Sequence, residues 1–156
     1  MSIAGYVKRF WRFHSLIVGA MGICVFTLGC AVQEPAPYEG TWIVTKAYQP
    51  GISALSLADA EHYLGRSVTY TSTSAKLDQI QCESPIYDST TLSNNEFYHH
   101  FNASPQALGF SDDSITEVTL SCDNGSENLG STLVLQEDTL AYTVIDGTFL
   151  KLEKTL

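Results

Sequence analysis

The chain has 156 residues, of which 44% are hydrophobic and 16% are charged, with 17 acidic and eight basic residues. This length suits one folded domain better than two. Every acid lies after residue 33, together with only five basic residues, so residues 34–156 carry a formal net charge of −12. Nucleic-acid binding requires Lys and Arg to neutralise phosphates, so this charge excludes nucleic acid as an expected partner and favours a cationic one.

The first thirty residues have the pattern of an export signal. Three basic residues among the first twelve precede an uncharged, mainly apolar run over residues 15–32. The sequence Thr27-Leu28-Gly29-Cys30 within this run resembles the lipobox of bacterial lipoproteins. The resemblance implies that residues 1–29 are a lipoprotein signal peptide and that Cys30 is acylated, with palmitate among its chains. An uncleaved anchor is the alternative, because about eighteen apolar residues approach the length of a spanning helix.

The residues after Cys30 predict a membrane-bound protein that faces the periplasm. Acyl chains on Cys30 hold a domain stably at a lipid bilayer when two or more are attached. Ala31 stands where an Asp would resemble an inner-membrane retention signal, so we expect the outer membrane, with the inner membrane as the alternative. Pro35 and Pro37 make residues 30–39 a short tether, which leaves residues 40–156 as a single strand-rich globular domain.

The four cysteines have separate expected roles. Cys24 leaves with the signal, Cys30 is the lipidation site, and Cys82 and Cys122 remain. In an oxidising compartment these last two are expected to form a disulfide. Closing a loop of about forty residues would stabilise the folded state by about 4 kcal/mol.

Alternation of apolar and polar residues and two helix-capping pairs divide the domain into its expected elements. Ser56 with Asp59, and Ser93 with Glu96, each predict the start of a short helix. Runs of period two predict strands, and Asp146-Gly147 predicts a tight hairpin turn. In chain order we expect a strand over 42–48, a helix over 57–64, strands over 67–72 and 75–81, a helix after 93, a helical turn from 105, and strands over 115–122, 131–136, 139–145 and 148–152.

Seven or eight short strands with two short helices predict a mainly β domain of the α+β type. A small antiparallel β-barrel is favoured because closure removes exposed edge strands, and an open sheet with a helix across one face is the alternative. Gly40-Thr41-Trp42 resembles the Gly-x-Trp signature of lipocalins and related calycins. The resemblance implies an eight-stranded barrel with Trp42 closing its base, where Lys151 or Lys154 could cover the ring.

A calycin-like barrel would hold a small apolar ligand in its interior. The expected ligand contacts are the inward side chains of the strands, namely Trp42, Val68, Tyr70, Leu120, Leu133 and Tyr142, with Ile43, Val118, Leu135 and Val144 as further candidates. A domain of this size can also fill its barrel with its own side chains, and we favour this alternative.

No pattern in the sequence predicts catalysis, a cofactor or a metal site. His99 and His100 are neighbours on a predicted helix, so their side chains point about 100° apart and cannot both coordinate one metal ion. If the protein were an enzyme, Glu96, His99 and His100 would be its candidate catalytic residues. We therefore expect a non-catalytic binding protein.

Three kinds of partner remain open at this point. The first is a small apolar ligand or a protein bound by the domain. The second is a cationic hydrolase such as lysozyme, which the domain would inhibit, because several periplasmic lysozyme inhibitors are small acidic β-barrel lipoproteins. The third is a structural role in the envelope, with exposed tyrosines such as Tyr48, Tyr63 and Tyr87 bridging partners.

Overall fold

The computed structural model describes residues 34–123 and 130–155. Pro35–Leu156 forms one compact unit. The expected signal peptide and Cys30 lie outside the described residues. Within the described ranges, no helix combines the length and the apolar character needed to cross a membrane.

The domain is mainly β, as the sequence predicts, and its described residues form nine strands and two short helices. The elements are β1 (Gly40–Tyr48), α2 (Leu57–Glu61), β2 (Ser67–Tyr70), β3 (Ser74–Leu77), β4 (Ile80–Glu83), β5 (Ile86–Ser93), α3 (Asn94–Phe101), the 3-10 turn η1 (Pro105–Leu108), β6 (Ser114–Ser121), β7 (Thr132–Glu137), β8 (Leu140–Ile145) and β9 (Thr148–Lys154).

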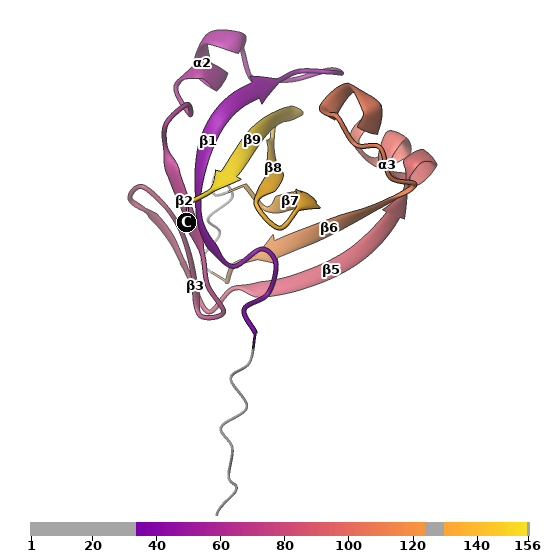
Figure 1. Ribbon diagram of the computed structural model, residues 1–156. Helices are drawn as coiled ribbons and strands as arrows, with labels where there is room; N and C mark the ends of the chain where they lie inside the picture. The colour runs from indigo at the N-terminus through magenta and orange to yellow at the C-terminus, as the bar shows by residue number, and fades with distance from the viewer. Residues whose placement is uncertain (1–33, 124–129, 156) are drawn as a thin grey trace, which may run out of the picture. The chain divides into compact units, whose positions relative to one another are not determined.

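All nine strands belong to one antiparallel sheet in the order β4-β3-β2-β1-β9-β8-β7-β6-β5. The two edge strands, β4 and β5, are separated in the chain only by Ser84 and Pro85. The sheet must therefore curl until its edges meet at this turn, and Figure 1 shows the curled sheet as a half-barrel. Counted as one bent strand, β4 and β5 complete an eight-stranded up-and-down meander whose first and last strands pair. The strand order thus agrees with a small antiparallel barrel.

The expected disulfide is confirmed, and it lies where the two edges of the sheet meet. Cys82 in β4 is bonded to Cys122, which follows β6, with a Cα–Cα distance of 5.7 Å. Nearby, the Tyr87 hydroxyl of β5 donates a hydrogen bond to the Thr71 carbonyl, which lies between β2 and β3 (3.0 Å). Covalent and hydrogen-bonded contacts therefore close one end of the gap between the edges.

The inner face of the curled sheet is one continuous apolar core. Side chains from eight of the nine strands meet in it, and Trp42, Tyr70, Leu133 and Leu152 are fully buried. Its members are Trp42, Val44, Val68, Tyr70, Ala75, Leu77, Cys82, Val118, Leu120, Leu133, Ala141, Ile145, Leu150 and Leu152. Because strands from opposite ends of the sheet contribute to it, this core lies inside the curl.

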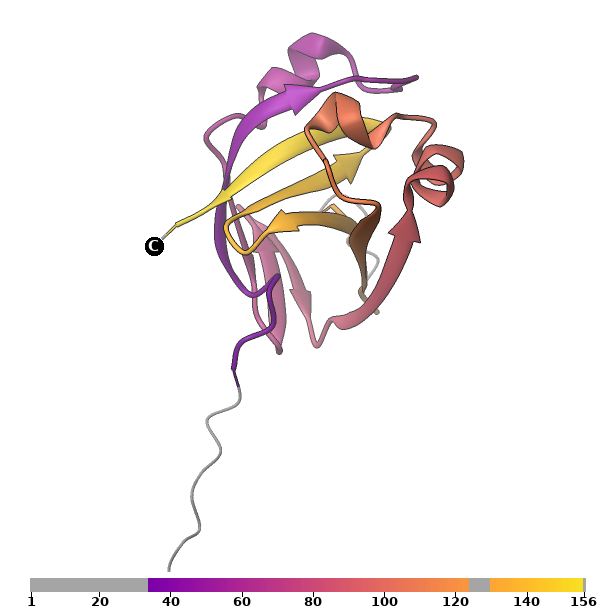
Figure 2. The same cartoon turned by 45° about the vertical axis from the view of Figure 1, so that its right-hand side comes forward.

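A second core covers the opposite face of β6 to β9. Helix α3 and the turn η1 lie over this face, as the rotated view shows (Figure 2). Phe97 of α3 packs against Phe101, Phe110 and Phe149, with ring centroids 4.7 to 6.1 Å apart. Strands β7 to β9 are therefore apolar on both faces, which we name the inner and the outer core.

Three local elements differ from the sequence prediction. The expected strand over 75–81 is two strands, β3 and β4, joined by a turn in which Asp78 has a φ of 52°. The helix expected over 57–64 ends as a helix at Glu61. The whole of β5 was not predicted, because Ile86–Ser93 is polar and mostly exposed and lacks an apolar alternation.

Candidate functional site

Trp42 in the inner core lies against a lysine from the last strand. The β1–β9 register places Lys154 opposite Trp42, and the Lys154 ammonium lies 4.9 Å from the centroid of the Trp42 ring. The indole Nε1 donates a hydrogen bond to the Tyr38 carbonyl (2.9 Å). A Cβ on Gly40 would lie 2.6 Å from the Lys154 side chain, so the glycine makes room for this lysine. Of the two expected lysines, Lys154 covers the tryptophan.

Five of the six expected ligand contacts lie together in the inner core. Trp42, Val68, Tyr70, Leu120 and Leu133 are each at most 4% exposed, and they pack in one cluster with Val118. Leu135 borders the same cluster, whereas Ile43 lies half-buried outside it. The inner core at these positions is occupied by the chain's own side chains, which agrees with the filled-barrel alternative.

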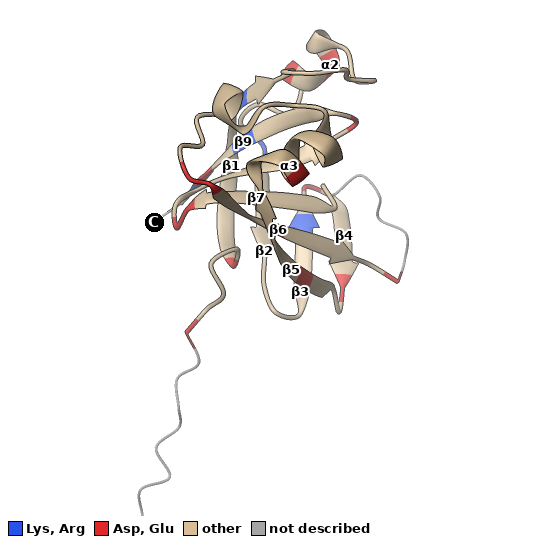
Figure 3. Ribbon diagram, turned by 90° about the vertical axis from the view of Figure 1, so that its right-hand side faces the viewer, with Lys and Arg blue, Asp and Glu red and all other residues tan. Residues whose placement is uncertain are grey.

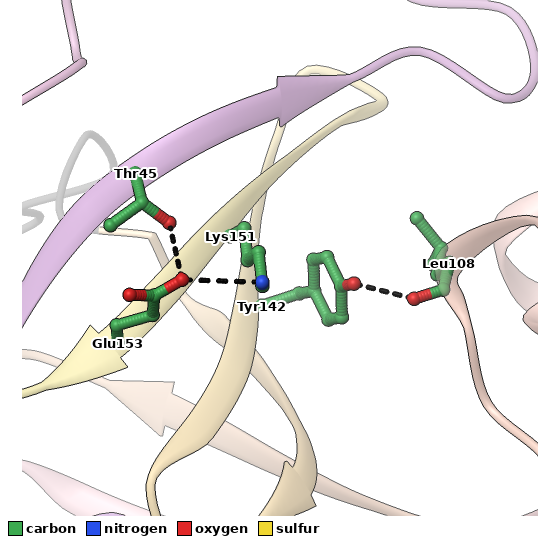
Figure 4. Close-up of polar contacts among 5 residues, drawn as sticks. All are labelled: Thr45, Leu108, Tyr142, Lys151 and Glu153. Carbon is green, nitrogen blue, oxygen red and sulfur yellow. Dashed lines mark hydrogen bonds and ion pairs between the residues drawn. The ribbon is translucent and has the colours of Figure 1, made fainter.

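The sixth expected contact, Tyr142, corrects the prediction because it faces the outer core. Its ring packs against Tyr48, Phe110 and Phe149, and its hydroxyl donates a hydrogen bond to the Leu108 carbonyl of η1 (Figure 4). Burial raises the pKa of Tyr142 to about 12. Val144 lies at the border of the same outer core. Tyr142 therefore attaches η1 to the sheet.

Tyr70 places a hydroxyl group in the apolar inner core. Its side chain is fully buried, and its hydroxyl has no hydrogen-bond partner among the residues that the structure describes. The Thr143 hydroxyl, itself buried, donates to the Thr132 carbonyl at 3.1 Å. Burial raises the pKa of Tyr70, and the nearby Thr143 hydroxyl offsets part of this rise. An unsatisfied buried hydroxyl costs about 1 to 3 kcal/mol, so this position is a polar spot in an apolar interior.

The polar groups of α3 have separate partners. Ser93 and Glu96 form the predicted capping box, in which the Ser93 amide donates to Glu96 Oε2 at 2.8 Å. Hydrogen bonds from the Ser93 side chain and backbone hold the pKa of Glu96 below its usual range. His100 Nε2 instead lies 3.7 Å from Glu117 Oε1 on β6. Glu96 therefore contacts Ser93 at the start of the helix, whereas His100 contacts Glu117 of the sheet.

The structure reveals one carboxylate that the sequence did not single out. The Glu117 side chain is only 8% exposed, whereas that of its neighbour His100 is 56% exposed. Glu117 lies on the face of β6 that α3 covers, directly opposite Thr90 of β5. Alternation along β6 gives no sign of this burial, because it arises only when α3 packs over the strand.

The tyrosines expected to bridge partners are less free than predicted. Tyr48, Tyr63 and Tyr87 are half-buried. The ring of Tyr87 stacks on that of Tyr38 with centroids 4.4 Å apart. Burial is the main cause that raises the pKa of Tyr87 to about 12, and the nearby Tyr38 hydroxyl adds to the rise. The large apolar side chains most open to solvent are instead Ile52, Ile86, Leu57 and Tyr98, which are 86%, 65%, 59% and 50% exposed.

Acidic residues are spread over the surface of the domain. Figure 3 shows acidic positions on α3 and β5 and few basic positions on the same side. The ion pair between Arg66 and Asp78 (3.3 Å) joins exposed side chains, and Lys151 binds Glu153 at 3.2 Å, with Thr45 donating to the same Glu153 oxygen (Figure 4). The surface therefore presents mainly negative charge to a partner.

Comparison with known proteins gives no further guide to this arrangement. No protein-family model matches the chain, and no curated protein and no solved structure matches it significantly.

Proposed function

We propose that this protein is a lipid-anchored, non-catalytic domain of the bacterial envelope that faces the periplasm and binds a positively charged protein. The observation that carries the proposal is the filled inner core, in which Trp42, Tyr70 and Leu133 are fully buried against neighbouring side chains. A filled interior directs recognition to the outer surface. That surface belongs to a segment with 17 acids against five basic residues, which would steer a cationic partner toward it.

The binding part of the proposal can be tested with lysozyme as the cationic probe. We expect the full-length chain in a nonionic detergent to bind labelled lysozyme in fluorescence anisotropy, with an affinity that falls steeply as salt screens the charges. Succinylated lysozyme, which has the same fold and a negative charge, is the matched control. Absence of binding to lysozyme at low salt would contradict the proposal.

The anchoring part of the proposal rests on the basic segment, the apolar run and the lipobox-like Cys30. We expect palmitate label to be incorporated by the wild-type chain and lost in Cys30→Ser, while Cys24→Ser, which changes another cysteine of the same apolar run, keeps the label. Label retained by Cys30→Ser would remove the lipoprotein assignment. Fractionation of the labelled envelope then separates the outer from the inner membrane.

Binding of a small apolar ligand is a second candidate, and the orphan hydroxyl of Tyr70 is the observation that favours it. A ligand with one polar atom could satisfy this hydroxyl inside the apolar core. Native mass spectrometry of protein purified from a bacterial envelope tests it by comparing native and denatured masses. Extra mass lost on denaturation, and reduced in Tyr70→Phe, would favour the ligand; a mass equal to that of the oxidised chain favours the filled interior.

A further inference from the structure

We infer that the free edge of β5 is a docking strand for an extended, positively charged segment of the partner protein, which adds a further strand to the sheet. The inference rests on the proposed function, since it assigns the surface that a cationic protein partner would use. Strand addition of this kind supplies affinity through main-chain hydrogen bonds and specificity through the alternating side chains.

The first argument is the exposure of β5. The strand pairs with β6 along its full length, from Ile86 opposite Ser121 to Ser93 opposite Ser114. Its other edge has no partner strand in the part of the chain that the structure describes. Residues 88–91 are exposed one after another, although successive side chains point to opposite faces. Both faces of this strand are therefore accessible along with its edge.

The second argument is that β5 lacks the devices that normally protect an edge strand. Natural edges are blocked by lysines, prolines or bulges. Ile86–Ser93 contains no lysine and no proline, its pairing with β6 is regular, and Asp88 is its only charged residue. Thr90 and Thr91 are β-branched residues that favour an extended strand. The edge strand at the other end of the sheet, β4, has only four residues and is tied to the chain after β6 through Cys82.

The third argument is charge. Asp88 is exposed on β5, and Glu117 lies opposite Thr90 on the neighbouring β6. Cross-strand neighbours on one face lie about 5 Å apart, so a Lys or Arg of an added strand would reach Asp88 directly. A second copy of the chain is the disfavoured occupant, because each copy brings the same net negative charge.

Hydrogen–deuterium exchange of the full-length chain in a nonionic detergent tests the inference. The probes are a blocked ten-residue peptide of alternating Lys and Val and the matching peptide of alternating Glu and Val. We expect the Lys peptide, and not the Glu peptide, to slow exchange of the amides of residues 88–93. Asp88→Asn should weaken binding of the Lys peptide by about two- to fivefold, whereas Asp138→Asn, an exposed acid in the β7–β8 turn, should leave it unchanged.

A pair of proline variants tests the main-chain contacts. Of two consecutive residues in an edge strand, one directs its N–H toward the paired neighbour and the other toward the free edge. We therefore expect one of Thr90→Pro and Thr91→Pro to keep the wild-type unfolding temperature and yet lose the Lys peptide. Peptide binding that survives in that stable variant would overturn the inference.

Two further results separate this inference from the proposed function. If lysozyme binds while the amides of residues 88–93 exchange as in the free chain, the docking strand is wrong and the proposed function stands. Protection of the same amides that rises with protein concentration, without peptide, would identify a second copy as the occupant and also overturn the inference. If neither lysozyme nor the Lys peptide binds, both the inference and the proposed function are wrong.

Discussion

The ammonium group of Lys154 lies 4.9 Å from the centroid of the Trp42 ring and donates a hydrogen bond to the Pro37 carbonyl at 3.0 Å. One side chain of the last strand therefore contacts the first strand and the segment that leads into it. Trp42 reaches the same segment through its bond to the Tyr38 carbonyl. These contacts attach residues 37 and 38 to strands β1 and β9.

Replacing Lys154 should lower stability more than replacing an ordinary exposed lysine. We expect Lys154→Met to reduce the free energy of unfolding by about 1 kcal/mol, because it removes a cation–π contact and a hydrogen bond while keeping the aliphatic stem. Lys76→Met, on an exposed position of β3, is the matched control. Urea unfolding followed by Trp42 fluorescence, in a Trp11→Phe background, measures both. Equal losses in the two variants would contradict a special role for Lys154.

The two buried tyrosines should respond oppositely to loss of the hydroxyl. Tyr142→Phe leaves the Leu108 carbonyl without its donor, so we expect a loss of about 1 to 3 kcal/mol in the free energy of unfolding. Tyr70→Phe removes a hydroxyl that has no hydrogen-bond partner within residues 34–123 and 130–155, so stability should stay the same or increase. Thermal unfolding of both variants provides the comparison. A large loss in Tyr70→Phe would mean that its hydroxyl is satisfied in solution, by water or by a ligand.

Removing the disulfide should destabilise the domain strongly. Cys82 and Cys122 are 40 residues apart, and a bond closing such a loop stabilises the folded state by about 4 kcal/mol. We expect the Cys82→Ser, Cys122→Ser double variant to lose this amount in denaturant unfolding. Dithiothreitol should destabilise the wild type equally and leave the double variant unaffected. A wild type unchanged by full reduction would show that hydrogen bonds alone hold the edges together.

The capping box of α3 should make stability depend on acidic pH. Hydrogen bonds to Ser93 lower the pKa of Glu96, so the unfolded state takes up its proton first as the pH falls. The stabilisation is therefore present above the ordinary glutamate pKa of about 4.5 and is lost as the pH falls through the lower folded value. We expect Glu96→Gln to differ from wild type in unfolding temperature at pH 7 and to converge with it at low pH.

A variant of the other member of the box separates the hydroxyl from the charge. Ser93→Ala removes the hydroxyl that accepts from the Glu96 amide, and it should cost about 1 kcal/mol at pH 7. A constant difference between Glu96→Gln and wild type from pH 7 to pH 3 would contradict the lowered pKa of Glu96.

Local signals predicted much of the fold because their causes lie within a few residues. The capping pair Ser93 and Glu96 gave the start of α3, and alternating residues gave the last four strands. Strand β5 was missed because both of its faces are exposed, so it needs no apolar alternation. The sequence could not predict which face of β8 points inward, because Ala141 and Tyr142 are both buried, one in each core.

The disulfide followed from the cysteine count, whereas the other site features depend on packing between distant elements. Glu117 is buried only because α3 packs over β6. The Tyr70 hydroxyl lacks a hydrogen-bond partner because of the side chains that distant strands place around it. Nothing within a few residues of either position carries that information. The resemblance to calycins left two lysines as candidates to cover Trp42. The β1–β9 register shows that Lys154 is the one that does so.

The pairing of β1 with β9 also constrains the order of folding. The last strand of the chain, β9, occupies the middle of the sheet, and the first strand of the domain, β1, is one of its two neighbours. The middle of the sheet can form only once residues 148–154 are present, so a growing chain holds at most the β1–β4 and β5–β8 segments as separate meanders. Contacts between such distant segments slow folding, because loop-closure entropy is lost before they form. We therefore expect the chain to acquire its complete sheet late and in a single cooperative step.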